Sequence, residues 1–224
     1  MLENIFGFLS GLKNYNYVPP KNMPHQAGVP QSAEGVFEIP SIASSWKGMV
    51  WHHSASKDNP LGNDWDGIKR YHMSWRVDGN IVSEEEYKAA VAVRKPHCEK
   101  PWSDIGYHLG LERVNGILQV KIGRPWNRAG AHAGFGKAEY GDKATDYYNQ
   151  NFLGCCIVGC YDAMAPDKET MDLCLAVTRQ IMAKFGFGKD SVLGHREVYD
   201  RVGVPRAKTC PGMAINLDSF RSNL

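Results

Sequence analysis

An unbroken apolar run from Phe152 to Tyr161 limits the folds open to this chain more than any other feature. The run is about half as long as a membrane-spanning helix requires, so it is not a candidate span. An apolar segment of this length without polar alternation is typical of a strand that is buried on both faces. Such strands occur in sheets that helices cover on each side, and the run therefore predicts an α/β domain.

Segments with strand and helix patterns alternate along the rest of the chain. Strands are expected at residues 48–53, 105–114, 117–122 and 191–193, where Asn115-Gly116 is the turn of a hairpin. Helices are expected at residues 64–75, 84–93 and 168–185, and from residue 217 onward. The hairpin adds antiparallel pairing to a sheet that is otherwise parallel. We therefore predict the α/β class, with a single domain in which helices flank a central mixed β-sheet.

Composition and charge exclude several classes of protein. The 224 residues are 43% hydrophobic and 22% charged, which is ordinary for a globular protein and unlike a disordered chain or a coiled coil. The formal net charge is only +2, from 26 basic and 24 acidic residues. Nucleic-acid binding usually shows as a strong basic stripe, so no nucleic-acid partner is expected.

The N-terminal segment differs in composition from the remainder. Five of the 12 prolines lie in the first forty residues, which is typical of an extended arm or linker. We therefore place a Pro-rich arm or linker at residues 1–44 and the globular domain at residues 45–224. No Lys or Arg precedes the short apolar run at residues 5–9, so no signal peptide is expected.

Cysteine usage points away from a disulfide framework. Most of the six cysteines fall in apolar or helix-like stretches, where a cysteine usually behaves as a small buried hydrophobe. Disulfide frameworks belong to shorter, loop-rich secreted chains. The thiols are therefore expected to be mostly free.

Three polar segments that follow strands or close a loop carry metal-ligand side chains. They contain His52 and His53, then His195, and finally Cys210. His52 and His53 are adjacent in a strand and point to opposite faces, so one site can use only one of them. Two neutral imidazoles and a thiolate suit a tetrahedral zinc ion with water in the fourth position. Lys208 shares a side with Cys210 in an extended loop, which places an ammonium beside the metal.

Local sequence alone leaves other interpretations open. A histidine at the end of a strand is more often a structural residue than a metal ligand, and a buried cysteine even more so. A closed structural zinc site built from cysteines is another alternative, although the sequence has no CxxC pair for it.

The polar segments resemble the zinc-dependent N-acetylmuramoyl-L-alanine amidases of the amidase type 2 family, which includes the peptidoglycan recognition proteins. Four blocks match this family in order over roughly residues 46–213. They are Trp51-His52-His53-Ser54-Ala55; Trp102-Ser103-Asp104-Ile105-Gly106-Tyr107-His108; Gly123-Arg124-Pro125 with Gly130-Ala131-His132-Ala133; and Gly194-His195-Arg196 with Lys208-Thr209-Cys210-Pro211-Gly212.

The resemblance implies a role for each of six residues. It assigns His52, His195 and Cys210 as zinc ligands, Tyr107 and Lys208 as catalytic residues, and His132 as a residue close to substrate. This chain departs from the family in having a longer segment between His52 and Tyr107, which includes the expected helix at 84–93. The Pro-rich arm also lacks a counterpart that we can place.

The resemblance also implies a reaction, a substrate and a biological setting. Zinc-activated water would cleave the amide bond between N-acetylmuramic acid and L-alanine in peptidoglycan. We expect a monomeric phage or prophage endolysin that stays in the cytoplasm until a holin-type partner releases it to the cell wall. The alternative is a non-catalytic peptidoglycan-binding module with a structural zinc, against which the presence of Tyr107, Lys208 and Cys210 together argues.

Overall fold

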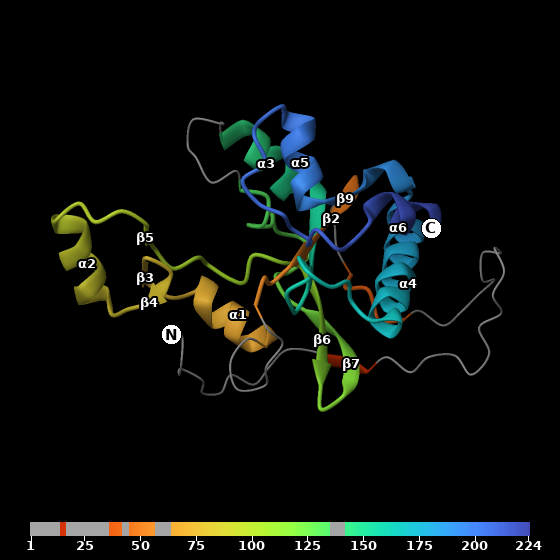
Figure 1. The fold of residues 1–224 in the computed structure, drawn as a ribbon, viewed down its shortest axis with the longest axis horizontal. Coiled ribbons are helices and arrows are strands. Elements are labelled where there is room, and N and C mark those ends of the chain that lie inside the picture. Colours follow the sequence, from red (N-terminus) through yellow and green to blue (C-terminus); the bar gives the residue numbers. More distant parts are fainter. Residues whose placement is uncertain (1–13, 17–35, 42–44, 57–63, 135–141) are drawn as a thin grey trace.

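The structure, a computed structural model, describes residues 14–16, 36–41, 45–56, 64–134 and 142–224, and its centre is a six-stranded sheet (Figure 1). The strand order is β1-β7-β6-β8-β2-β9. The bounds are β1 Asn14–Asn16, β2 Gly48–His53, β6 Leu109–Val114, β7 Ile117–Ile122, β8 Phe152–Ile157 and β9 Val192–Gly194. Strands β6, β8, β2 and β9 are parallel neighbours, whereas β1 and β7 pair antiparallel. The predicted α/β class with a mixed sheet is therefore confirmed.

Six α-helices lie within the described ranges. They are α1 Trp65–His72, α2 Glu84–Ala92, α3 Asp142–Asn151, α4 Lys168–Phe185, α5 His195–Val202 and α6 Leu217–Ser222, and a 3-10 turn occupies Lys189–Ser191. Helices α4 and α6 lie on one side of the sheet, and α1 lies on the other (Figure 1). In the part of the chain that the structure describes, no helix is both long and apolar enough to cross a membrane.

Alternation along β2 sends its side chains into two different cores. Met49 and Trp51 belong to the core beneath α4 and α6, whereas Val50 packs with residues of α5. His52 continues the Val50 side by the same period-two rule. The His52 imidazole, near the end of β2, therefore lies on the face of the sheet that α1 and α5 border.

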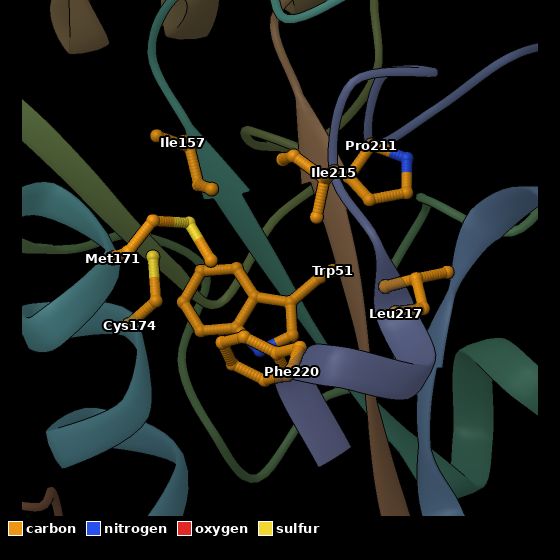
Figure 2. A pocket seen from close by; sticks show the side chains of 8 residues that line it. All are labelled: Trp51, Ile157, Met171, Cys174, Pro211, Ile215, Leu217 and Phe220. Carbon is orange, nitrogen blue, oxygen red and sulfur yellow. The ribbon is translucent and has the colours of Figure 1, made fainter. Parts of the chain in front are cut away.

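Among the described residues, the α4 side of the sheet contains a small internal void. A void of about 10 Å³ lies beside the Trp51 ring among side chains of β2, β8, α4 and α6, and its lining is apolar (Figure 2). The residues around it are Trp51, Ile157, Met171, Cys174, Pro211, Ile215, Leu217 and Phe220. Such a volume holds at most about one water, and an apolar lining offers that water no partner. The void is therefore a small packing gap in the core.

Several element boundaries differ from the sequence-based prediction. The apolar run ends as a strand at Ile157, because Gly159 has a φ of +142° and donates its N–H to the Ser54 hydroxyl at 2.8 Å. The hairpin begins at Leu109 and not at residue 105, so Tyr107 lies in the connection before β6. Helix α3 was not predicted, because its sequence is polar and contains few apolar residues.

Part of the N-terminal arm packs on the domain. Strand β1 extends the sheet by pairing with β7, and Phe37 is only 3% exposed, with its ring 6.0 Å from that of Trp126. The boundary expected after residue 44 is therefore not the limit of packing. Proline density indicates an extended chain, but an extended chain can still add a strand or bury an aromatic ring. Within residues 1–44, only 14–16 and 36–41 are among the described residues.

Within the extra segment between His52 and Tyr107, residues 76–99 fold into a small unit that projects from the body of the molecule (Figure 1). It comprises α2 and a three-stranded sheet of β3 Arg76–Val77, β4 Asn80–Ile81 and β5 Cys98–Glu99. Arg76 joins this unit to the body. Its guanidinium carbon lies 4.6 Å from the centre of the Tyr71 ring and 5.2 Å from that of Trp102, and it forms an ion pair with Glu99 at 2.6 Å.

Replacing Arg76 with alanine should loosen this unit without unfolding the central sheet. Arg76 is 2% exposed, so the variant loses two desolvated cation–π contacts, each worth about 0.5–2 kcal/mol. Amide hydrogen exchange should accelerate across residues 76–99 and stay unchanged in β2 and β8. Lys95→Ala is the matched control, because its ion pair with Asp78 is exposed and such pairs contribute little. Equal exchange in the two variants would show that Arg76 is not the anchor.

Candidate active site

A cleft of about 970 Å³ lies at the carboxyl end of β2, on the side of the sheet that α1 and α5 border. The residues selected from the sequence come from segments far apart in the chain, yet all of them line this cleft. They are His52, Tyr107, His132, His195, Lys208 and Cys210. The fold thus brings together every residue of the predicted site, whereas the role of each stays a prediction.

Parallel pairing of β2 with β9 explains how the two predicted histidine ligands meet. Trp51 pairs with Gly194, so His52 and His195 are the next residues along two neighbouring segments, and their ring centres lie 4.7 Å apart. A Cβ on Gly194 would lie 2.6 Å from Cδ of Pro211. Glycine at this position therefore lets the loop that carries Cys210 approach the end of the sheet.

His52, His195 and Cys210 form a buried group with converging ligand atoms. One potential ligand atom of each residue lies within 4.8 Å of those of the other two. Nδ1 of His52 is 3.4 Å from Sγ of Cys210. Burial lowers the pKa of His52 and brings the pKa of His195 to about 3, so both imidazoles are neutral near pH 7. Neutral imidazoles are the form that binds a metal ion.

One ring nitrogen of His195 has no hydrogen-bond partner among the described residues. Its Nε2 is buried and makes no hydrogen bond, while the ring is hydrogen-bonded to the backbone of Gly134. The bond to the carbonyl must therefore use Nδ1–H, which leaves the lone pair on Nε2. An orphaned buried nitrogen beside a second imidazole and a thiol fits a zinc ion, which prefers nitrogen and sulfur donors.

Cys210 supplies the sulfur of this group. Burial raises the pKa of its thiol to about 12, although the backbone N–H of His53 and the charge of Lys208 act in the opposite direction. The His53 N–H donates to Sγ at 3.3 Å. Because a metal ligand must be the thiolate, metal binding here would release a proton.

Tyr107 and Lys208 border the metal-ligand group from two other segments. The Tyr107 ring centre lies 5.1 Å from that of His52, and its hydroxyl is hydrogen-bonded to the thiol of Cys156. Burial raises the pKa of Tyr107 well above its ordinary value, so the hydroxyl keeps its proton. Lys208 is exposed, and its positive charge acts on His52, His195 and Cys210. The site thus has one hydroxyl donor and one ammonium beside the candidate metal position.

His132 is buried beside the first of these ligands. Its Nδ1 lies 3.0 Å from Nε2 of His52, and its own Nε2 lies 3.0 Å from the carbonyl oxygen of Phe152. Both ring nitrogens therefore have partners inside the protein. Contact between the ring edge and a substrate stays a prediction, but neither nitrogen is left to bind one.

The structure adds two residues to the cleft wall that the sequence analysis did not select for a role. The rings of His72 and Trp102 stack with their centres 4.4 Å apart, and both residues line the cleft. His72 Nδ1 accepts a hydrogen bond from the Gly106 N–H at 3.1 Å, just before Tyr107. His72 ends a helix and carries no local motif, so only the tertiary fold reveals its position.

Buried neutral histidines should make the metal-free protein sensitive to mild acid. Burial lowers the pKa of His108 from 6.5 to about 4, and its side chain is fully buried. Between these pH values the unfolded chain binds a proton that the folded chain does not. The free energy of unfolding should therefore fall with decreasing pH, by about 1.4 kcal/mol per pH unit for this residue.

Urea unfolding of the metal-free protein between pH 7 and 4 measures this dependence. His108→Asn should show a smaller slope of unfolding free energy against pH than the native protein, whatever its stability at pH 7. Equal slopes in the two proteins would show that His108 does not stay neutral in the folded state.

Comparisons with known proteins identify the family of the chain. The sequence profile described as N-acetylmuramoyl-L-alanine amidase matches residues 43–213. Similar solved structures include the N-acetylmuramoyl-L-alanine amidase LysC from Clostridium intestinale URNW, with 18% identity, a TM-score of 0.47, and coverage of 82% of this chain and 97% of that chain. Drosophila peptidoglycan recognition protein SD is another, with 22% identity, a TM-score of 0.45, and coverage of 80% and 82%. No curated protein matches the sequence. Because the profile spans most of the chain, the protein belongs to the N-acetylmuramoyl-L-alanine amidase family.

Proposed function

We propose that this protein is a zinc-dependent amidase that hydrolyses the bond between N-acetylmuramic acid and L-alanine in peptidoglycan. The observation that carries the proposal is the convergence of His52, His195 and Cys210 in one cleft that Lys208 and Tyr107 also line. Three protein ligands leave an open position, which is typical of a catalytic zinc and not of a structural one.

The side chains of the cleft have separate roles in amide hydrolysis. A zinc ion held by His52, His195 and Cys210 would supply Lewis-acid chemistry and would make water a better nucleophile near neutral pH. The Lys208 ammonium stabilises the negative charge that develops on the carbonyl oxygen during attack. The Tyr107 hydroxyl, which keeps its proton, donates a hydrogen bond to the same carbonyl oxygen or to the attacking water.

The shape and charge of the cleft support a glycopeptide substrate. Lys208, Arg196 and Arg206 lie along its lining, and among the described residues no aspartate or glutamate does. This charge favours the carboxylates of a stem peptide. The stacked rings of His72 and Trp102 form an apolar wall on which the carbon face of a sugar can pack.

Release of stem peptides from purified peptidoglycan tests the proposal. Mass spectrometry should detect new L-alanine amino termini that require zinc and disappear with a chelator. New reducing sugar ends would instead show a glycosidase and overturn the assignment of the bond. Zinc and wall binding without any release would support the recognition module, the alternative function from another class.

A further inference from the structure

A chain of three groups leads from the backbone of β8 to the first candidate zinc ligand. Nε2 of His132 lies 3.0 Å from the carbonyl oxygen of Phe152, which can only accept a hydrogen bond. The proton of His132 is therefore on Nε2. In the neutral ring, Nδ1 is then an acceptor, and Nε2 of His52 must donate to it across 3.0 Å.

This arrangement leaves the second nitrogen of His52 without a proton. With Nε2–H directed at His132, the lone pair of His52 is on Nδ1, the atom that faces Sγ of Cys210 at 3.4 Å. In His195 the two nitrogens have the opposite roles. Its Nδ1–H donates to the backbone of Gly134, and its Nε2 lone pair has no partner among the described residues. Both histidines are thus held in the tautomer that presents a free lone pair to the ligand group.

The protein is built closely around the His132 ring. A Cβ on either Gly130 or Gly154 would lie 2.4 Å from its Cδ2 atom, so two glycines form the slot that holds the ring. The Asn149 side chain accepts hydrogen bonds from the backbone N–H of His132 at 2.9 Å and of Ala133 at 3.1 Å. Backbone and ring are therefore fixed independently, and the Nδ1 acceptor has one position.

We infer that His132 is a positioning residue that fixes His52 as the Nε2–H tautomer and thereby makes His52 Nδ1 the zinc-binding atom. The consequence for zinc affinity rests on the proposed function, whereas the tautomer itself does not. A ligand histidine usually donates its second N–H to a carboxylate, a carbonyl or water. Here the acceptor is a neutral imidazole, which is oriented by its own bond to the backbone.

Two replacements of similar shape separate hydrogen bonding from packing. Asparagine places its side-chain oxygen close to the position of His132 Nδ1, whereas leucine places a methyl group there. Chelator competition should show that zinc affinity falls about 10–100-fold in His132→Leu and clearly less in His132→Asn. Equal losses in both variants, or an affinity for His132→Leu within about twofold of the native value, would overturn the inference.

Nitrogen NMR of the metal-free protein reads the tautomer directly. His52 should be protonated on Nε2 in the native protein and in His132→Asn, and should lose this preference in His132→Leu. His132→Asn is the matched control, because it removes the ring but keeps an acceptor near the position of His132 Nδ1. An unchanged tautomer in His132→Leu, or the same change in His132→Asn, would overturn the inference. No zinc or substrate is needed, so failure of the proposed amidase activity would be seen separately.

Discussion

Replacing Lys208 with methionine should lower kcat by about 100- to 1000-fold while the protein still binds zinc. Methionine keeps the length and much of the volume of the side chain and removes only the charge. Lys208 is exposed in the loop before Cys210, so its replacement leaves no buried group unpaired and should not destabilise the fold. The loss therefore measures the stabilisation of developing negative charge during amide hydrolysis.

The direction in which zinc affinity changes in Lys208→Met distinguishes a catalytic role of Lys208 from a role in metal binding. The charge of Lys208 lowers the pKa values of His52 and His195, which means that it disfavours further positive charge at the ligand group. By the same electrostatics, a zinc ion is repelled by Lys208. Zinc affinity in Lys208→Met should thus be unchanged or slightly higher, in contrast to its kcat.

Single-turnover rates on peptidoglycan and zinc content measured on the same sample check this expectation. Lys184→Met, an exposed replacement in the last turn of α4, controls for the loss of one surface charge. A Lys208→Met protein with native kcat would remove Lys208 from the catalytic residues. A protein that loses zinc in parallel with activity would make Lys208 part of the metal site instead.

The candidate metal ligands could be selected from the sequence because they lie in polar segments at strand ends or in a closed loop, and because these segments resemble a known family. His52 lies near the end of β2 and His195 directly follows β9, and the structure pairs these two strands directly. Strand alternation also indicated that His53 faces away from His52. In the structure its Nδ1 accepts a hydrogen bond from the Tyr161 N–H at 3.1 Å.

The supporting residues of the site could not be predicted, because their roles depend on contacts made only in the folded chain. Asn149 lies on α3, whose polar sequence gives little helical signal. This helix is held by tertiary packing, as in the contact of Tyr148 with Phe152, whose ring centres lie 5.0 Å apart. The partners of His132 likewise come from β2 and β8, and no spacing in the sequence relates them.

Replacing Cys210 with serine should lower zinc affinity by about 100-fold. Structural zinc sites bind with about 10–16 kcal/mol from four ligands, so one ligand contributes roughly 3 kcal/mol, or about two orders of magnitude. A serine hydroxyl is of similar size but keeps its proton at neutral pH and is a poor zinc ligand. Activity should fall at limiting zinc and recover in part when zinc is added in excess.

The pH dependence of zinc affinity identifies the group that is lost. The pKa of the Cys210 thiol is about 12 without metal, so zinc uptake near neutral pH must displace a proton from sulfur. The affinity of the native protein should therefore rise about tenfold per pH unit from pH 5.5 to 7. The histidine ligands add no slope there, because burial holds the pKa of His195 at about 3 and that of His52 well below its ordinary value.

Cys210→Ser should lose most of this slope together with its affinity, since serine gives up no thiol proton. Cys174→Ser is the matched control, because Cys174 is equally buried but lies on the α4 side of the sheet, away from the cleft. It should bind zinc with native affinity and native pH dependence. If Cys210→Ser instead keeps the native affinity and slope, the sulfur is not a ligand, and the metal group reduces to His52 and His195. Because neutral imidazoles release no proton when they bind zinc, a site of His52 and His195 alone should bind weakly and with little pH dependence in both the native protein and the variant.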